Sequence, residues 1–154
     1  MESTNRRQFS KVAAVAAGSL LNLNPRAFGA GEKVTLALIG GHNQGRWVAG
    51  RAIKAGAVIK TICDIDEAVI DMISPEMEKA QGSKPARVRD FRRVLDDKEI
   101  DAVIIAPPDH WHTHMALLAC QAGKDVYVEK PLSQTIAEGH MIREAARKYK
   151  RIVQ

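Results

Sequence analysis

The chain has 154 residues, of which 45% are hydrophobic, so it has enough apolar side chain for one domain with a buried core and no room for two large domains. The formal net charge is +5, but residues 1–30 hold +3 of it, with four basic side chains against one acidic. Residues 31–154 hold the remaining +2, from 19 basic and 17 acidic side chains, which argues against a nucleic-acid partner.

Residues 1–30 predict an export signal. Arg6-Arg7-Gln8-Phe9 stands near the start, Lys11 follows, and a mildly apolar, alanine-rich run extends over residues 12–21. The paired arginines resemble a twin-arginine signal, which directs a protein to the twin-arginine export machinery. The alternative is an ordinary N-terminal tail that happens to contain two arginines.

Small residues at Ala27 and Gly29 indicate cleavage near Gly29, so we expect a periplasmic or otherwise exported protein. The apolar run of about ten residues is too short for a stable membrane span. We assign residues 33–154 to the folded domain.

A strand, a glycine turn and a helix follow the signal segment. Residues 34–39 form a short run of branched apolar side chains, which predicts a buried parallel strand that ends at Gly40-Gly41. Apolar residues at helical spacing over 48–53 predict a helix directly after the turn. The first N–H groups of such a helix, together with its dipole, form a binding site for an anion such as pyrophosphate.

The turn matches most of the G-x-G-x-x-G pattern of dinucleotide-binding domains. Gly40 and Gly45 occupy its first and third positions, but His42 occupies the second, where a side chain would crowd the pyrophosphate. Residues 57–63 predict the next strand, and Asp64 at its tip is the acidic residue expected to bind a ribose. The alternative is a strand-to-helix turn that binds nothing. The remaining turn residues that we assign to the cofactor site are Gly41, Asn43 and Gln44.

Strands and helices continue to alternate along the chain. We expect a helix over residues 65–80, interrupted near Ser74-Pro75 because proline cannot continue the hydrogen bonding of a helix. The elements expected next are a loop over 81–85, a short edge strand over 86–89, a short helix over 91–97 and a buried strand over 101–106.

The last third of the chain predicts a helix over 112–122 closed by Gly123, a strand over 125–128 and a final helix. Thr135 and Glu138 form a capping box for this final helix, and residues 151–154 resemble the start of another strand. The inner face of the final helix is expected to carry Ile142, Ala145, Ala146 and Tyr149. The alternation predicts an α/β fold with a doubly wound parallel sheet, the Rossmann type.

In such a sheet, ligands bind at the C-terminal ends of the strands, where the loops 40–45, 107–112 and 129–131 should meet. We therefore add Pro107, His110 and Glu129 to the candidate cofactor contacts. Lys130 is the candidate catalytic residue, since a partly buried ammonium beside a nicotinamide could orient a substrate hydroxyl. The alternative is a surface lysine in an ordinary turn.

His110, His112 and His114 alternate along one segment, but no fourth ligand has the spacing of a known zinc motif, so we predict no metal site. The two cysteines, Cys63 and Cys120, are expected to be buried small hydrophobic residues, and nothing in their spacing supports a disulfide.

Several of these segments resemble the N-terminal half of the Gfo/Idh/MocA oxidoreductases, the family of glucose-fructose oxidoreductase and inositol dehydrogenase. The similarity rests on the glycine turn at Gly40 and on Cys63-Asp64-Ile65-Asp66, Ala106-Pro107-Pro108-Asp109-His110-Trp111-His112 and Val128-Glu129-Lys130-Pro131-Leu132. It runs from about Lys33 to Gln154, and its Glu-Lys-Pro motif is specific.

The resemblance implies an NAD(P)-dependent redox reaction on a sugar, inositol or related polyol. It implies that Gly40 and Gly45 bind the pyrophosphate, Asp64 the adenosine ribose, and Lys130 the nicotinamide and substrate. Asp64 favours NAD because its charge would repel the 2′-phosphate of NADP, although Arg46 could soften that preference.

The resemblance also implies a C-terminal substrate domain, which is absent from these 154 residues. We therefore expect a chain with little or no activity by itself, the product of a truncated gene. The alternatives are an exported dinucleotide-binding module without turnover and the front half of an NAD-dependent glycosidase.

Overall fold

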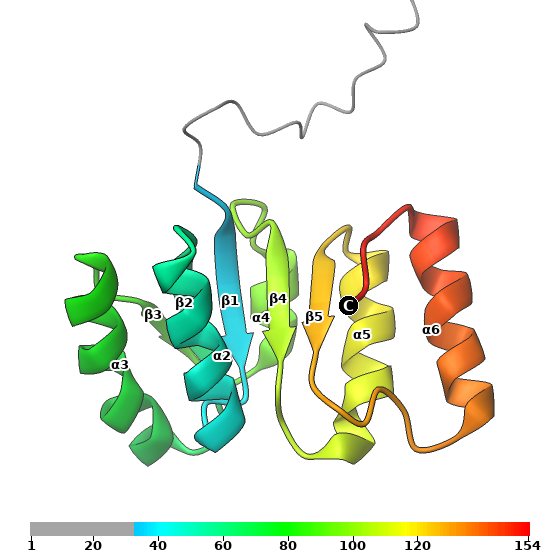
Figure 1. The fold of residues 1–154 in the computed structure, drawn as a ribbon, viewed down its shortest axis with the longest axis horizontal. Coiled ribbons are helices and arrows are strands. Elements are labelled where there is room, and N and C mark those ends of the chain that lie inside the picture. Colours follow the sequence, from blue (N-terminus) through cyan, green and yellow to red (C-terminus); the bar gives the residue numbers. More distant parts are fainter. Residues whose placement is uncertain (1–32) are drawn as a thin grey trace, which may run out of the picture. The chain divides into compact units, whose positions relative to one another are not determined.

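The computed structural model describes residues 33–154, so the expected export signal and its cleavage point near Gly29 lie outside the described residues. Each strand is followed by a helix, as Figure 1 shows. The elements in chain order are β1 (Thr35–Ile39), α2 (Asn43–Lys54), β2 (Val58–Cys63), α3 (Glu67–Gln81), β3 (Ala86–Val88), α4 (Phe91–Asp96), β4 (Ala102–Ile105), a short 3₁₀ turn (Asp109–Trp111), α5 (His112–Gln121), β5 (Asp125–Val128) and α6 (Ile136–Tyr149).

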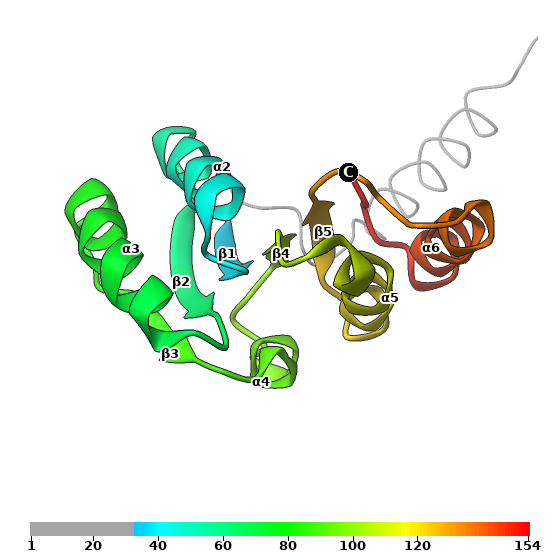
Figure 2. The same ribbon diagram turned by 90° about the horizontal axis from the view of Figure 1, so that it is seen from below.

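The five strands form one parallel sheet in the order β3-β2-β1-β4-β5. The chain winds outward from β1 in one direction to β3 and then returns to continue from β4 to β5 in the other direction. Helices α2 and α3 cover one face of the sheet, and α4 and α5 cover the other (Figure 2). The predicted doubly wound α/β fold is therefore confirmed.

Strand β1 shows why a continuous apolar run predicts a central parallel strand. Leu38 packs into the hydrophobic cluster beneath α2 and α3, whereas Ala37 and Ile39 pack into the cluster beneath α4 and α5. All three residues are buried, because both faces of the sheet are covered by helices.

The expected break in α3 is wrong, because residues 67–81 form one helix with Pro75 inside it. Proline lacks the N–H that would bond to the carbonyl of Asp71, so the helix has one hydrogen bond fewer. Apolar side chains before and after the proline pack into the same cluster, and this packing outweighs the missing bond. Both ends are also capped, by the Asp66 side chain, which accepts from the Ala68 N–H, and by Gly82 in the left-handed conformation. The apolar side chains before and after Pro75 that pack into this cluster are Ile70, Ile73 and Met77.

The side chain of Gln81 completes the edge of β2 where β3 does not reach. Strand β3 pairs only with residues 61–63 of β2. The Gln81 amide accepts a hydrogen bond from the Ile59 N–H at 2.8 Å and donates to the Ile59 carbonyl at 2.9 Å, as a neighbouring strand would. It also donates to the Ser83 carbonyl at 2.9 Å, which holds the loop against the strand.

The end of the chain follows the sequence prediction closely. The capping box of Thr135 and Glu138 is present at the start of α6, and Ile142 and Ala145 are buried on its inner face. Ala146 and Tyr149 are half-buried on the same side. Val153 pairs with Val126 in a parallel bridge, so the last residues do begin a strand beside β5. Within residues 33–154, no helix combines the length and the apolar character needed to cross a bilayer.

Candidate functional site

The turn after β1 is built from glycines that no other residue could replace. Gly40 has a φ of +85°, its N–H donates to the Cys63 carbonyl at 2.9 Å, and a Cβ there would lie 2.5 Å from the Pro107 nitrogen. A Cβ at Gly45 would overlap the carbonyl oxygen of Gly40. The first and third glycines of the pattern are thus required by the close approach of the turn, the start of α2 and the loop after β4.

His42, which stands at the second glycine position of the pattern, needs no glycine conformation. It is the N-cap of α2, with φ −68° and ψ 154°, an extended geometry that any residue adopts. Its neighbour Asn43 has a φ of +27°, in a region where asparagine is enriched. The backbone of the turn therefore forms without strain at His42, and its exposed side chain borders the space above the helix N-terminus.

Asp64 is held in place by two backbone N–H groups. Its Oδ2 accepts from Gly41 at 2.8 Å, and its Oδ1 accepts from Asp66 at 3.0 Å. The carboxylate is half-buried at the end of β2, directly beside the glycine turn. Gly41 thus belongs to the site through this bond rather than by lining the cavity.

A cavity of about 880 Å³ opens along the C-terminal edge of the sheet, which is large enough for a small-molecule cofactor. It brings together seven of the predicted cofactor contacts, from the loops after β1, β2 and β4. These are Gly40, His42, Asn43, Gln44, Asp64, Pro107 and His110.

The same cavity is lined by residues that the sequence analysis missed. Ile65, Arg89 and Arg92 follow the ends of β2 and β3 and extend the cavity beyond Asp64. Their position after parallel strands was a usable signal, because all such strands end at the same edge. Cys63 also lines the cavity, and burial together with the charges of Asp64 and Asp90 raises the pKa of its thiol to about 12. It is buried, as predicted, and so is Cys120, and both are free thiols.

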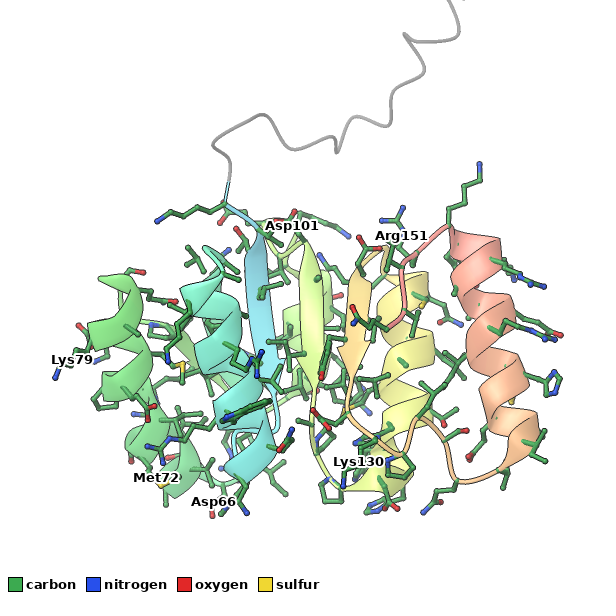
Figure 3. All side chains as sticks on the ribbon, viewed as in Figure 1. Asp66, Met72, Lys79, Asp101, Lys130 and Arg151 are labelled. Atoms are coloured by element: carbon green, nitrogen blue, oxygen red, sulfur yellow. The ribbon has the colours of Figure 1, made fainter. Side chains whose placement is uncertain are left out.

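Lys130 lies at this same edge of the sheet, where Figure 3 also shows Asp66, while Asp101 and Arg151 lie at the opposite edge. The side chain of Lys130 is exposed. Its neighbour Glu129 is buried, and its Oε1 accepts hydrogen bonds from the Gln44 amide at 3.1 Å and from the Tyr127 hydroxyl at 3.3 Å. The loop that carries Lys130 is thereby connected to the glycine turn.

His112 connects the loop after β4 to the loop after β5. The residue is 2% exposed, and its ring places Nδ1 2.7 Å from the carbonyl oxygen of Pro131 and Nε2 3.0 Å from that of Pro107. His110 and His114 are exposed, and each ring lies about 6 Å from the ring of Trp111. Among residues 33–154, no cluster of His, Cys, Asp and Glu side chains is arranged to hold a metal ion.

Arg46 does not lie beside Asp64. Its Nε donates to Glu76 Oε2 at 2.6 Å, and its side chain lines a separate groove between α2 and α3. The expectation that Arg46 softens the cofactor preference set by Asp64 therefore finds no support in this geometry.

A family profile agrees with the strand, turn and helix described above. The profile of an oxidoreductase family with an NAD-binding Rossmann fold matches residues 34–154. The chain belongs to the Gfo/Idh/MocA oxidoreductase family. Residues 33–154 are thus the NAD-binding Rossmann domain of a Gfo/Idh/MocA oxidoreductase.

Three relatives show how this Gfo/Idh/MocA chain compares with known proteins. An alpha-N-acetylgalactosaminidase of Shewanella oneidensis is 36% identical over 95 residues, which is 59% of this chain and 21% of that protein. The structure of an NAD-binding oxidoreductase from Klebsiella pneumoniae matches with a TM-score of 0.67 and 27% identity, over 80% of this chain and 34% of that one. Levoglucosan dehydrogenase in complex with NADH matches with a TM-score of 0.64 and 27% identity, over 79% and 34%.

The chain spans about a fifth of the length of the first curated relative and about a third of the two solved structures. The similarity therefore covers the cofactor-binding fold and leaves the rest of each relative unmatched.

Proposed function

We propose that the chain binds NAD along the C-terminal edge of its sheet, with the pyrophosphate at the N-terminus of α2 and the adenosine ribose at Asp64. The observation that carries this proposal is the hydrogen bond from the Gly41 N–H to Asp64 Oδ2, which joins the pyrophosphate-binding turn to the ribose-binding carboxylate. The cavity above them is lined by His42, Asn43 and Gln44 at the start of a helix, whose first N–H groups have no partner within the helix.

We further propose that NAD is preferred to NADP. The Asp64 carboxylate lies where the adenosine ribose would bind, and its negative charge would repel a 2′-phosphate. Arg89 and Arg92, which also line the cavity, already face carboxylates, Arg89 facing Glu67 at 3.6 Å and Arg92 facing Asp90 at 3.2 Å. The local charges therefore favour a free 2′-hydroxyl.

In the complete protein, the reaction is proposed to be the oxidation of a hydroxyl-bearing carbon of a sugar or polyol. When bound, NAD would accept the hydride from that carbon. Lys130, exposed at the same edge, would donate a hydrogen bond to the substrate hydroxyl and hold it beside the nicotinamide. We expect the 154-residue chain alone to bind cofactor without turnover, because its matches cover only the cofactor-binding part of longer proteins.

A second candidate is the front half of a glycosidase that oxidises its sugar transiently and then returns the hydride. The identity of 36% with a relative named as an alpha-N-acetylgalactosaminidase favours it. The two candidates share the same cofactor site and differ in whether reduced cofactor accumulates. An exported binding module without turnover is the third candidate, and it predicts cofactor binding alone.

Export by the twin-arginine route is also part of the proposal, supported by the Arg6-Arg7-Gln8-Phe9 sequence. A fusion of residues 1–30 to a reporter that is active only after export as a folded protein tests it. Export that stops when both arginines are replaced by lysine is the expected result, and export that continues would contradict it.

Calorimetric titration of the chain with NAD and with NADP tests the cofactor proposal. We expect micromolar NAD affinity, weaker NADP affinity, and a loss of NAD affinity of about tenfold in Asp64→Ala, in line with a charge-assisted hydrogen bond. Asp96→Ala, an exposed aspartate of α4, is the matched control and should bind as the wild type. Absence of NAD binding by a folded wild-type sample would overturn the proposal.

A further inference from the structure

We propose that Glu129 is a positioning residue that holds Lys130 in register with the pyrophosphate-binding turn through its hydrogen bond with Gln44. This inference rests on the proposed function, since it concerns where the nicotinamide half of NAD would lie relative to Lys130. It adds a role for Gln44, whose side chain takes no part in the glycine pattern itself.

The contacts of Glu129 connect two loops that are far apart in the sequence. Oε1 accepts from the Gln44 amide at 3.1 Å, and Oε2 accepts from the backbone N–H of Lys130 at 3.2 Å. The backbone N–H of Glu129 donates to the Ile105 carbonyl at 2.9 Å, which anchors the loop to the end of β4. Gln44 and Glu129 are 85 residues apart, so this bond joins the first and last loops of the site.

The environment of Glu129 is costly for a residue with a merely structural role. Glu129 is only 7% exposed. The groups that donate hydrogen bonds to its carboxylate, from Gln44, Tyr127 and Lys130, are all neutral. A buried carboxylate with neutral partners is less stable than one paired with a cation. Burial and the neighbouring Glu129 charge raise the pKa of Tyr127, which keeps its hydroxyl protonated as a donor.

Gln44 is placed to transmit the position of a bound pyrophosphate. It lies in the first turn of α2, lines the cavity with His42 and Asn43, and is itself exposed to solvent. A ligand that orders this turn fixes the Gln44 amide, and the Gln44 amide fixes the Glu129 carboxylate. Because the same carboxylate binds the N–H of Lys130, the lysine becomes ordered together with the turn.

The test compares NAD, NADH and 5′-AMP as probes, because 5′-AMP reports on the adenosine half alone. In the full chain, Gln44→Ala and Glu129→Ala should each weaken NAD binding by about five- to tenfold, the range expected for a lost hydrogen bond, and leave 5′-AMP affinity within about twofold. Both variants should also reduce the fluorescence enhancement of bound NADH at saturation, which reports on order around the nicotinamide. The double variant should be little weaker than either single variant, since both remove the same bond.

Conservative replacement separates positioning from folding. Glu129→Gln retains an oxygen that can accept from Gln44 and Tyr127, so it should keep the fold. Its NH₂ group would face the Lys130 N–H, so the link to Lys130 is lost and NAD affinity should stay about three- to tenfold below the wild type. Gln44→Ala replaces an exposed side chain, so it should retain the fold even where Glu129→Ala does not. Gln121→Ala, at the far end of α5, and Glu144→Ala, on α6, are exposed controls that should bind as the wild type.

Two results would overturn the inference while leaving the proposed function standing. One is unchanged NAD affinity and NADH fluorescence in Gln44→Ala, and the other is equal weakening of NAD and 5′-AMP. A wild-type chain that binds 5′-AMP and NAD with equal affinity would also overturn it, because the nicotinamide half would then make no contact. A wild-type chain that binds neither probe would overturn the proposed function itself.

Discussion

The Asp64 carboxylate accepts one hydrogen bond from Gly41, in the turn after β1, and one from Asp66, at the start of α3. The two bonds aim the carboxylate from both sides, so its direction is set before any ligand binds. A preorganised acceptor of this kind spends little free energy on ordering when a ribose arrives.

Replacing Asp64 by asparagine tests this preorganisation. The asparagine oxygen can accept from Gly41, but its NH₂ group would then face the Asp66 N–H, so one of the two backbone bonds is lost. We expect NAD affinity to fall by about threefold to tenfold and the preference for NAD over NADP to shrink, since the charge is gone. Paired titrations with the two cofactors measure both effects. An unchanged ratio of the two affinities would show that Asp64 does not set the preference.

Gly45 is the position in α2 where a methyl group has no room. Gly45→Ala would push a Cβ into the Gly40 carbonyl, so we expect a loss of about 2 kcal/mol in the free energy of unfolding and no measurable NAD binding. Gly50→Ala is the matched control, because a Cβ at Gly50 meets no atom within 4 Å in the same helix. It should stabilise the domain by about 0.5 to 1 kcal/mol. Urea unfolding of both variants measures these changes in stability. A Gly45→Ala domain as stable as the wild type would contradict the close approach of Gly45 to the Gly40 carbonyl.

His112 is expected to be important for the stability of the site because its ring lies between two carbonyl oxygens. The substitution His112→Ala removes the ring, so the carbonyls of Pro107 and Pro131 lose this partner and a cavity opens. We expect the free energy of unfolding to fall by about 2 to 3 kcal/mol. His140→Ala, on the exposed side of α6, should change stability by less than about 0.5 kcal/mol.

A neutral imidazole carries one N–H and can donate to only one of these carbonyls. Nitrogen chemical shifts of the His112 ring distinguish the neutral form from the doubly protonated one, which can donate to both. Equal stability of the two alanine variants would mean that the loops after β4 and β5 do not depend on this histidine.

The ion pair between Lys60 and Asp97 gives the domain a defined dependence on pH. Hydrogen bonding to Lys60 lowers the pKa of Asp97, and hydrogen bonding to Asp97 and Glu99 raises the pKa of Lys60. The stabilisation is therefore lost as the pH falls through the lowered pKa of Asp97 and, at the alkaline end, as it rises through the raised pKa of Lys60.

Lys60→Met should lower the free energy of unfolding by about 0.5 kcal/mol at neutral pH, because both side chains are about one third exposed and screened by solvent. The difference from the wild type should vanish in acid below the pKa of Asp97. Urea unfolding at several pH values and low salt measures it, with Lys84→Met in the exposed loop after α3 as control. A difference that grows in acid would contradict the assignment.

Much of the fold could be predicted from the sequence, because buried strands and their boundaries leave local signals. The run before Gly40 and the run before Pro107 each predict a strand covered on both faces, and the structure contains both. The break expected at Pro75 did not occur, since a local rule about hydrogen bonding says nothing of the packing on either side of the proline.

The candidate site was predicted less completely, for a related reason. Spacing along the chain places Asp64 and the glycine turn at one edge of the sheet, and the structure joins them. No spacing rule could predict that Gln44 meets Glu129, that Arg46 turns toward Glu76, or that Lys130 is exposed. These contacts depend on side-chain directions that only the packed helices determine.

The carboxamide of Gln81 protects the domain against self-association, and the same group is a point at which chemical ageing would remove that protection. By occupying the N–H and the carbonyl of Ile59, it withholds from other molecules the stretch of β2 that β3 leaves open. Deamidation to glutamate would keep the acceptor for the Ile59 N–H and destroy both donors, and it would place a negative charge against two carbonyl oxygens. The storage life of a purified sample would then depend on one amide bond in a side chain remote from the cofactor site.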